Sequence, residues 1–421
     1  MIELDAAHPQ LAGLVRPGDM VLWAQAAAEP VPLTSALMAQ RAAIGNLRAF
    51  VGISWSGAVQ VAHADHVSFL AYGAGGNNRL LAKAGCLDIL ACHYSQVPGL
   101  IERGLLKVDV VLLQVAPPDA SGRHSLSLAV EYLLPAIRTA RVVIAEVNAQ
   151  APRTCGPHAL AADEIDYVVH TDRAPLAPPA GKPHPAEAQV ARHVASLIED
   201  GATLQYGIGS LPEAIVGQLA DRRELGVHSG AIGDATAALM RAGVITNARK
   251  TIDAGITIAG TLMGSSLLNA FAHDNPALEL RGVEYTHALP VLASIDRLVA
   301  INSAVEVDLT GQVNAEVANG VYVGAVGGAI DFTRGAMASR GGVPIVALTS
   351  RTDGKQISRI VARLHGPVST ARSDAAVIVT EHGIADLRGL SLRQRVPRMI
   401  AIAHPEEREA LERAARELPL A

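Results

Sequence analysis

The chain has 421 residues, of which half are hydrophobic and 3% aromatic, and its formal net charge is −5 at pH 7. This length exceeds what one hydrophobic core usually organises, so we expect two domains. An acidic chain with few aromatic side chains is a poor partner for nucleic acid. The N-terminus lacks the pattern of a signal peptide, and no apolar run reaches the roughly 20 residues of a membrane span. We therefore expect a soluble cytoplasmic protein that binds neither nucleic acid nor membrane.

The cysteines and histidines give no sign of a metal site. Cys86, Cys92 and Cys155 are sparse and include no CxxC pair, which argues against a disulfide framework or a zinc knuckle. His63 and His66 are the nearest histidine pair, but they lack a set of carboxylates or thiolates at ligand spacing. We expect no metal cofactor.

Short β-branched runs alternate along the chain with helical patterns of apolar residues. Residues 108–113, 142–145 and 345–348 are examples of the strand pattern. This alternation predicts βαβ units and mostly parallel sheets. The expected fold class is therefore α/β, with two open, doubly wound α/β/α domains.

A proline-rich stretch divides the chain. Residues 174–185 contain five prolines, which favour extended backbone and cannot continue a helix. We interpret this stretch as a linker between an N-terminal α/β domain, residues 1–173, and a C-terminal α/β domain, residues 186–421.

The two halves begin in a similar way. Residues 18–23 reach Pro30 after a loop of small residues, much as residues 201–206 reach Pro212. Further along the chain the match is loose. The pattern is consistent with an internal duplication of one half-fold.

The start of the second half can be interpreted in detail. The apolar residues of 190–198 fall on one helical face, and Gly201 is suited to a C-terminal cap. Residues 203–206 have the pattern of the strand that follows. After a glycine turn, Ser210 and Glu213 have the spacing of a capping box, which predicts the start of the next helix.

Two glycine loops are candidate binding sites. The turn Gly207, Ile208, Gly209 places backbone N–H groups at a helix N-terminus, where a pyrophosphate or a developing oxyanion is stabilised. Gly327 and Gly328 form a second loop whose N–H groups can converge on one oxygen. The alternative for the first loop is an ordinary tight strand-to-helix turn, and for the second it is a hairpin or a close packing of chains. The GxGxxG and GxSxG patterns are missing at these loops, so nicotinamide binding and the usual α/β-hydrolase chemistry are not supported.

Four segments resemble the landmarks of the acetyl-CoA hydrolase and 4-hydroxybutyrate CoA-transferase family, and they occur in that family's order. They are residues 146–154, 204–209, 301–313 and 381–389. The resemblance extends from about residue 14 to residue 410. It implies two related domains of the class I CoA-transferase type, with CoA lying between them.

In the transferases of this family, a glutamate in a His-Ser-Glu or His-Thr-Glu motif attacks the acyl-CoA thioester and becomes a covalent intermediate. The matching motif here is His228, Ser229 and Gly230, so the catalytic position carries no side chain. The family's Gly-Val-Gly-Gly-Gln loop also differs, because it reads Ala-Val-Gly-Gly-Ala at residues 325–329. The two changes suggest a remodelled site.

Other parts of the family site are present. The resemblance implies that Asn302, Gly327 and Gly328 donate hydrogen bonds to the thioester oxygen. It also implies binding of CoA or acyl-CoA by one set of residues: Gln205, Gly207, Ile208, Gly209, Asn302, Val326, Gly327 and Gly328.

Asp234 and Glu29 are the carboxylates that we consider as replacements for the missing glutamate. The alternatives are a helix-capping aspartate and a solvated loop glutamate. A further alternative is that Gly230 makes room for a bulkier acyl group.

The hypothesis that follows is an acyl-CoA-processing enzyme of this family, in which hydrolysis or modified chemistry is favoured over glutamate-dependent CoA transfer. Its partners would be acyl-CoA and, for transfer, a carboxylic acid. The alternative is a catalytically silent acyl-CoA-binding or regulatory homologue. Because homodimers are common among soluble proteins, we expect a homodimer.

Overall fold

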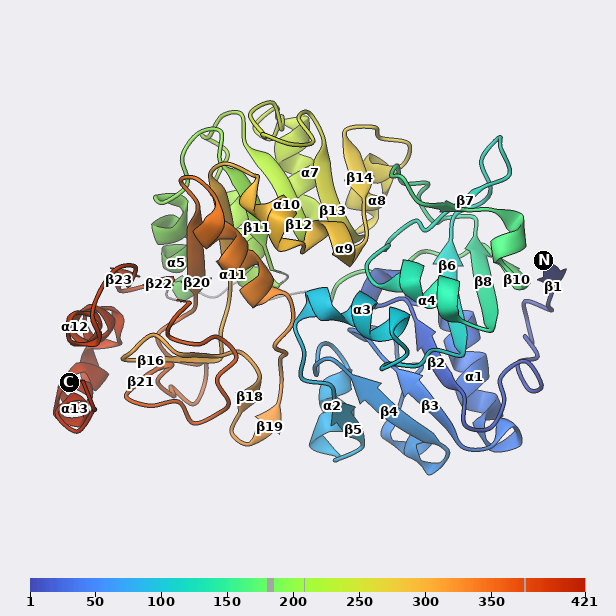
Figure 1. The fold of residues 1–421 in the computed structure, drawn as a ribbon, viewed down its shortest axis with the longest axis horizontal. Helices are drawn as coiled ribbons and strands as arrows, with labels where there is room; N and C mark the ends of the chain where they lie inside the picture. Colours follow the sequence, from blue (N-terminus) through green and yellow to red (C-terminus); the bar gives the residue numbers. More distant parts are fainter. Residues whose placement is uncertain (180–184, 208, 375, 421) are drawn as a thin grey trace. The chain divides into compact units, whose positions relative to one another are not determined.

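The computed structural model describes residues 1–179, 185–207, 209–374 and 376–420. The fold is mixed α/β with largely parallel sheets (Figure 1), which confirms the predicted class. The chain forms two compact units. Unit 1 consists of Met1–Pro179, Gly230–Asp234 and Ile256–Ala288, and unit 2 contains the described residues of Ala180–Ser229, Ala235–Gly255 and Leu289–Ala421.

Unit 1 is built on an eight-stranded sheet in the order β1-β10-β8-β6-β2-β3-β4-β5, with parallel neighbours. The strands are β1 (Ile2–Glu3), β2 (Met20–Trp23), β3 (Leu47–Phe50), β4 (Val67–Ala71), β5 (Leu87–Ile89), β6 (Val110–Val115), β8 (Val142–Asn148) and β10 (Tyr167–Thr171). Every residue of β2, β6 and β8 is buried. Central parallel strands covered on both faces have this unbroken apolar character.

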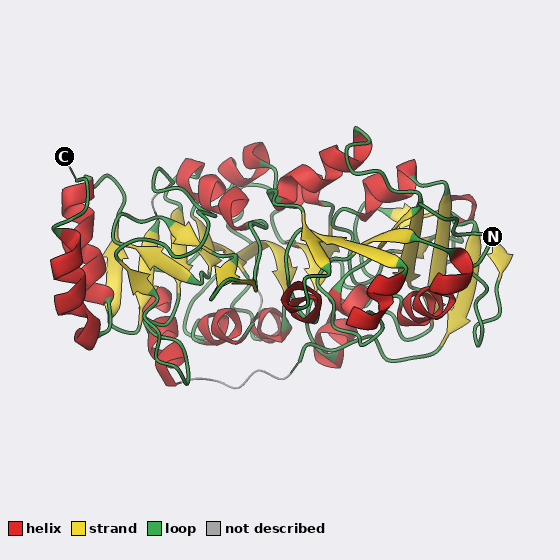
Figure 2. Ribbon diagram, turned by 90° about the horizontal axis from the view of Figure 1, so that it is seen from below, coloured by secondary structure: helices red, strands yellow, loops and turns green. Residues whose placement is uncertain are grey.

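Helices and short strands complete unit 1. The helices are η1 (Ala26–Ala28), α1 (Val31–Ile44), η2 (Val61–Asp65), α2 (Asn78–Lys83), η3 (Tyr94–Gln96), α3 (Val97–Glu102), α4 (Leu133–Thr139), η4 (Ala162–Glu164), α8 (Ser266–Ala272) and α9 (Val283–Thr286). The remaining strands are β7 (His124–Ser125), β9 (Ala159–Leu160), β13 (Thr257–Leu262) and β14 (Leu278–Leu280). Figure 2 shows helices on both sides of the strands in each unit.

Unit 2 has strands in the order β12-β11-β15-β20-β22-β23, and β22 and β23 form an antiparallel pair. The strands are β11 (Thr203–Tyr206), β12 (Gly226–Ile232), β15 (Leu298–Asn302), β20 (Val343–Ala347), β22 (Val377–Thr380) and β23 (Gly383–Asp386). The division between the units passes through β12, after Ser229.

The helices of unit 2 include two at its C-terminal end. They are α5 (Pro185–Ala195), α6 (Ser210–Gly217), α7 (Asp234–Arg241, from Ala235 on), α10 (Leu289–Ala293), α11 (Ala329–Ala338), α12 (Leu392–Ile402) and α13 (Pro405–Ala415). Short strands form two small sheets: β16 (Glu306–Asp308), β17 (Val313–Asn314) and β21 (Ile360–Val361), and β18 (Val317–Ala318) with β19 (Val321–Tyr322).

The same strand order recurs in the two units. In unit 1, β2 lies between β3 and β6, and β8 follows β6. In unit 2, β11 lies between β12 and β15, and β20 follows β15. This repetition is what an internal duplication would produce.

The expected strands at 108–113, 142–145 and 345–348 are confirmed as β6, β8 and β20, with shifted ends. The domain boundary at residues 174–185 stays a prediction, and residues 180–184 of that linker lie outside the described residues.

Two local predictions at the start of unit 2 were wrong. Helix α5 ends at Ala195, so Gly201 does not cap it. Gly201 has a φ of +72° in the turn before β11, where a Cβ would lie 2.5 Å from Cδ of Arg249. A glycine is therefore required there by the backbone and by Arg249.

The capping box at Ser210 does not form, because Gly209 is the N-cap of α6 and no side chain caps it. Ser210 Oγ instead donates to Glu187 at 3.0 Å, and Glu213 accepts from the N–H of Ala235 at 3.1 Å. The two side chains of the expected box therefore pair with residues distant in the sequence instead of capping α6.

Candidate functional site

The first group of candidate residues lies at the carboxyl edge of the unit 2 sheet. β11 and β15 are adjacent and parallel, with Tyr206 opposite Ile301. Because the carboxyl ends of parallel strands meet at one edge, Gln205 and Asn302 come together there. In open α/β sheets this edge is the usual place for a ligand.

The side-chain amides of Gln205 and Asn302 face each other. Gln205 Nε2 lies 3.4 Å from Asn302 Oδ1, and Asn302 Nδ2 lies 3.4 Å from Gln205 Oε1. Both residues are buried. Each amide nitrogen carries two hydrogens, so this pairing leaves Asn302 a second hydrogen for a substrate oxygen.

The glycine turn after β11 donates less than expected. The N–H of Gly207 donates to the carbonyl of Ile301 at 3.1 Å, so it holds β11 to β15. Gly209 has a φ of +117° and is the N-cap of α6. Ile208 lies outside the described residues. The backbone donors that remain here belong to the first turn of α6.

The second glycine loop leads into α11. Gly328 is the N-cap of this ten-residue helix, and Gly327 has a φ of +56°. Just before them, Gly324 and Ala325 donate backbone hydrogen bonds to residues 315–316. The loop, including Val326, is half-buried. Its backbone N–H groups therefore lie at the positive end of a helix, where an oxyanion is favoured.

Gly230 lies near the end of β12 in unit 1 and is half-buried. Its carbonyl is close to Gly260 of β13, because a Cβ at Gly260 would lie 2.7 Å from the Gly230 oxygen. In unit 2, Ser229 Oγ donates to the carbonyl of Tyr206 at 3.1 Å and so ties β12 to β11. Two glycines, Gly230 of β12 and Gly260 of β13, are therefore in close approach in unit 1.

Asp234 begins α7, but its side chain caps a different helix, α8. Its Oδ1 accepts from the N–H groups of Ser265, at 3.0 Å, and Leu268, at 3.2 Å. These groups belong to the first turn of α8, where an acidic side chain satisfies unpaired donors. The carboxylate of Asp234 is therefore already occupied.

Glu29 is not a solvated loop residue, because its exposed fraction is 0%. Oε1 accepts from the N–H groups of Trp55 and Ser56, and Oε2 accepts from the Ser56 hydroxyl at 2.6 Å. Burial raises the pKa of Glu29 despite these hydrogen bonds. Its carboxyl group anchors the loop at residues 55–56.

Sequence reasoning missed a buried polar cluster in unit 1, formed by Gln25, Tyr72, Tyr94, Glu131 and Tyr132. The amide of Gln25 is its centre. Its Oε1 accepts from Tyr72 at 2.8 Å, and its Nε2 donates to Glu131 Oε1 at 2.7 Å and to Tyr94 at 3.0 Å. The signal was present as a single acidic residue inside the apolar run of residues 126–137.

Burial raises the pKa of Glu131 to about 7, more than its hydrogen bonds with Gln25 and Tyr94 lower it. Its Oε2 is buried and has no hydrogen-bond partner among the described residues. Glu131 therefore has one fixed carboxyl oxygen and one that is unused.

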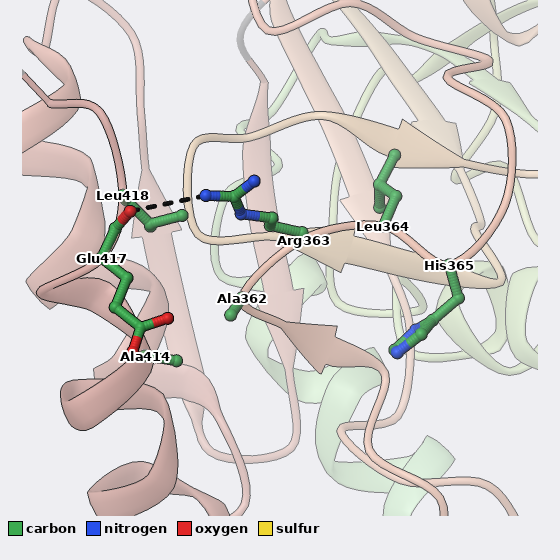
Figure 3. Close-up of a pocket in the computed structure, with 7 residues that line it drawn as sticks. All are labelled: Ala362, Arg363, Leu364, His365, Ala414, Glu417 and Leu418. Carbon is green, nitrogen blue, oxygen red and sulfur yellow. Dashed lines mark hydrogen bonds between the residues drawn. The ribbon is translucent and has the colours of Figure 1, made fainter.

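Two shallow cavities lie elsewhere in unit 2. One of about 360 Å³ is lined by Ala362, Arg363, Leu364, His365, Ala414, Glu417 and Leu418 (Figure 3). Arg363 donates across it to the carbonyl of Glu417 at 3.4 Å. The other, of about 450 Å³, lies between α12 and α13. Neither contains a candidate residue, so they do not bear on the site.

Within the described part of the chain, no three His, Cys, Asp or Glu side chains are grouped as a metal would require. The described helices are all too short or too polar to cross a membrane.

Comparison with known proteins gives matches to two family models. The Acetyl-CoA hydrolase/transferase N-terminal domain matches residues 6–178, and the corresponding C-terminal domain matches residues 264–415.

Individual relatives are similar over most of their length. The 4-hydroxybutyrate coenzyme A transferase of Clostridium kluyveri is 37% identical over 401 residues, which cover 93% of this chain and 92% of the relative. A succinyl-CoA:cyclohexane-1-carboxylate CoA transferase of Geobacter metallireducens is 35% identical over 84% of this chain and 82% of its own. The crystal structure of RipA from Yersinia pestis superposes with a TM-score of 0.93 at 31% identity, covering 100% and 98% of the two chains.

Proposed function

Because the chain belongs to the acetyl-CoA hydrolase/transferase family, and is thus an acyl-CoA hydrolase or CoA-transferase, we propose that it cleaves acyl-CoA thioesters by hydrolysis. Transfer of CoA through a glutamyl intermediate at position 230 is not available to it, since Gly230 has no side chain. The acyl group is bound as its CoA thioester, and the products are a carboxylic acid and free CoA.

One observation carries this proposal. The carboxyl edge of unit 2 presents hydrogen-bond donors, at Asn302 and at the helix N-terminus that begins with Gly328. The family resemblance assigns the nucleophile to position 230, where the sequence has a glycine. Donors of this kind stabilise the negative charge that develops on a thioester oxygen, and each is typically worth about 2.7–4 kcal/mol of barrier. The arrangement supports polarisation of a thioester without covalent catalysis.

The chemistry needs only water as co-reactant. The water oxygen forms a bond to the carbonyl carbon, the oxyanion is held by the donors, and the carbon–sulfur bond then breaks. The proton of the water ends on the CoA thiolate or in solvent. Without the covalent step the rate should fall well below that of a glutamate-dependent transferase.

The substrate is proposed as an acyl-CoA whose acyl group is to be identified by a panel. The panel includes the acyl groups named for relatives, 4-hydroxybutyrate and cyclohexane-1-carboxylate, together with acetyl, butyryl and succinyl. CoA release is measured with a thiol reagent, and CoA exchange onto added acetate is measured in parallel. Release that does not depend on acetate supports the proposal, whereas exchange at ordinary transferase rates contradicts it.

The substitution Gly230→Glu is the sharpest test of the assigned position. We expect this variant to exchange CoA onto a free acid and to form an enzyme thioester that hydroxylamine cleaves. The wild-type chain is the matched control and should form no such adduct. If neither protein turns over any acyl-CoA but both bind CoA tightly, the chain is instead a silent acyl-CoA-binding homologue.

The expected homodimer is tested separately, by measuring the molar mass of the protein in solution with light scattering.

A further inference from the structure

Unused buried polar atoms gather at the carboxyl edge of the unit 1 sheet. Ser54 follows β3 and Asn78 follows β4. Glu131 and Tyr132 come after β7, and Glu131 is bonded to Gln25, which follows β2. In each of the first four residues, one side-chain oxygen is buried and has no hydrogen-bond partner among the described residues. Buried polar groups are normally paired, so such a concentration at the ligand-binding edge of an α/β sheet indicates a functional site.

Glu131 is the ionisable member of this group, and its carboxyl group is held in place. Gln25 makes four hydrogen bonds through its amide, because Oε1 also accepts from the N–H of Ile53 at 2.7 Å. This fixes the nitrogen that donates to Glu131 Oε1. Oε2, on the other side of the carboxyl group, is thereby fixed in position and has no hydrogen-bond partner among the described residues.

Glu131 lies close to the position of the missing nucleophile. The N–H of Val130 donates to the carbonyl of Gly260 at 3.0 Å, and Gly260 in turn lies against the carbonyl of Gly230. Three backbone segments therefore run side by side in unit 1. At the usual strand spacing of about 4.8 Å, the outer two are roughly 10 Å apart. Neither glycine places a side chain between them.

The backbone around Glu131 is strained. Glu131 has a φ of +42°, and Ala26, next to Gln25, has a φ of +52°. Residues other than glycine avoid this region, and such outliers cluster at functional sites. The strain is thus at Glu131 itself and at the residue that follows Gln25, the donor to its carboxyl group.

The two other carboxylates near the candidate site are committed elsewhere. Asp234 caps α8, and both oxygens of Glu29 hold the loop at residues 55–56. Of these three carboxyl groups, only that of Glu131 has an oxygen that is not engaged.

We propose that Glu131 is the general base that activates water for thioester hydrolysis, in place of the glutamate that is missing at position 230. This inference rests on the proposed function. Oε2 accepts a proton from water as the water oxygen bonds to the carbonyl carbon. The carbon–sulfur bond breaks, CoA leaves as the thiolate, and the proton on Glu131 passes to that thiolate or to solvent. The products are the carboxylic acid and CoA.

The protonation state of Glu131 should govern the rate. Its pKa of about 7 suits a base that acts near neutral pH. The titratable groups around it are Tyr72, Tyr94 and Tyr132, with Cys92 beside Tyr72, Glu29 beside Tyr132 and His287 beside Tyr94. The rate should therefore rise with pH through about 7.

The test uses the full-length protein and the acyl-CoA that the wild type hydrolyses fastest. Glu131→Gln retains an oxygen for the Gln25 amide but cannot accept a proton, so we expect kcat to fall about 100-fold or more, with KM changed less than threefold. The rise of kcat near pH 7 should disappear. Glu131→Asp should recover part of the rate and of the pH dependence. Glu102→Gln, which removes an exposed carboxylate from unit 1, is the control for loss of charge.

The outcomes are distinguishable. If the wild type hydrolyses acyl-CoA and Glu131→Gln stays within fivefold of it with the same pH profile, the role of Glu131 is overturned while the proposed function stands. A wild type without turnover overturns both. Circular dichroism and unfolding at pH 8 confirm that each variant is folded, and loss of rate with an unchanged fold supports the base.

Discussion

At the scale of single residues, the burial of Glu131 makes folding stability depend on pH. Its pKa is about 7 in the fold, against 4.5 for an ordinary glutamate, because burial penalises the charged form. The folded protein therefore binds more protons than the unfolded chain between these values. The favourable contribution is complete below about pH 4.5 and is lost as pH rises through 7.

This linkage predicts the behaviour of Glu131→Gln. Between pH 5 and pH 8, the free energy of unfolding of the wild type should fall by about 2–3 kcal/mol relative to that of the variant, which has no titrating group at this position. Urea unfolding of both proteins at the two pH values measures the difference. If the difference in free energy of unfolding between the two proteins does not change with pH, Glu131 ionises normally in the fold.

The carboxylates Asp234, Glu29 and Glu131 show which properties of a residue the sequence alone does not reveal. The sequence identified Asp234 and Glu29 as candidates, because acidic residues stand near the expected site. It could not assign their backbone partners, which are N–H groups 26 to 34 residues away. Glu131 was missed since its importance depends on burial, and burial is decided by tertiary packing.

At the scale of elements, α8 depends on a cap from outside its own sequence. Asp234 accepts from the N–H groups of Ser265 and Leu268, while the Ser265 hydroxyl accepts from Leu267. We predict that Asp234→Ala lowers the free energy of unfolding by about 1 kcal/mol, as the loss of a helix cap usually does. Hydrolysis should remain within a few-fold of wild type.

Chemical denaturation and CoA release measure these two quantities on the same samples. Ser265→Ala is the matched control, because it removes the other side-chain cap of α8 at a similar cost. A loss of more than 100-fold in rate from Asp234→Ala alone would instead make Asp234 part of the chemistry.

Helices and strands were predicted correctly where the local sequence determines them. They were predicted wrongly where contacts with distant residues determine their ends. β11 was placed correctly, since a short run buried on both faces carries its own signal. The predictions for the end of α5 and for the cap of α6 were wrong because distant residues form the local hydrogen bonds. Arg222 donates to the carbonyls of Ala195 and Ile198, and the side chains of Ser210 and Glu213 pair with Glu187 and Ala235. Contacts of this kind have no short-range signature.

At the scale of the whole molecule, the alternation of strands and helices was enough to predict the α/β class and parallel sheets. The alternation did not predict which segments of the chain belong to which compact unit. Residues 230–234 and 256–288 follow the expected linker in the sequence, yet they belong to unit 1. Membership depends on long-range hydrogen bonds, such as that from Leu262 to the carbonyl of Leu128 at 2.8 Å.

The make-up of unit 1 predicts that residues 1–179 do not fold as an independent domain. In this fragment the segment around Glu131 would lose Gly260, which accepts from Val130, and Val283, whose N–H donates to the Glu131 carbonyl at 3.0 Å. Each lost hydrogen bond costs about 0.5–1.5 kcal/mol net, and buried side chains such as Leu128 would lose their cover. Together these losses are large against the roughly 5–15 kcal/mol of a typical domain. We expect the fragment to show no cooperative urea transition and poorly dispersed amide NMR signals, whereas the full chain unfolds cooperatively. A fragment with native-like dispersion would instead support an autonomous N-terminal domain that ends at the proline-rich linker.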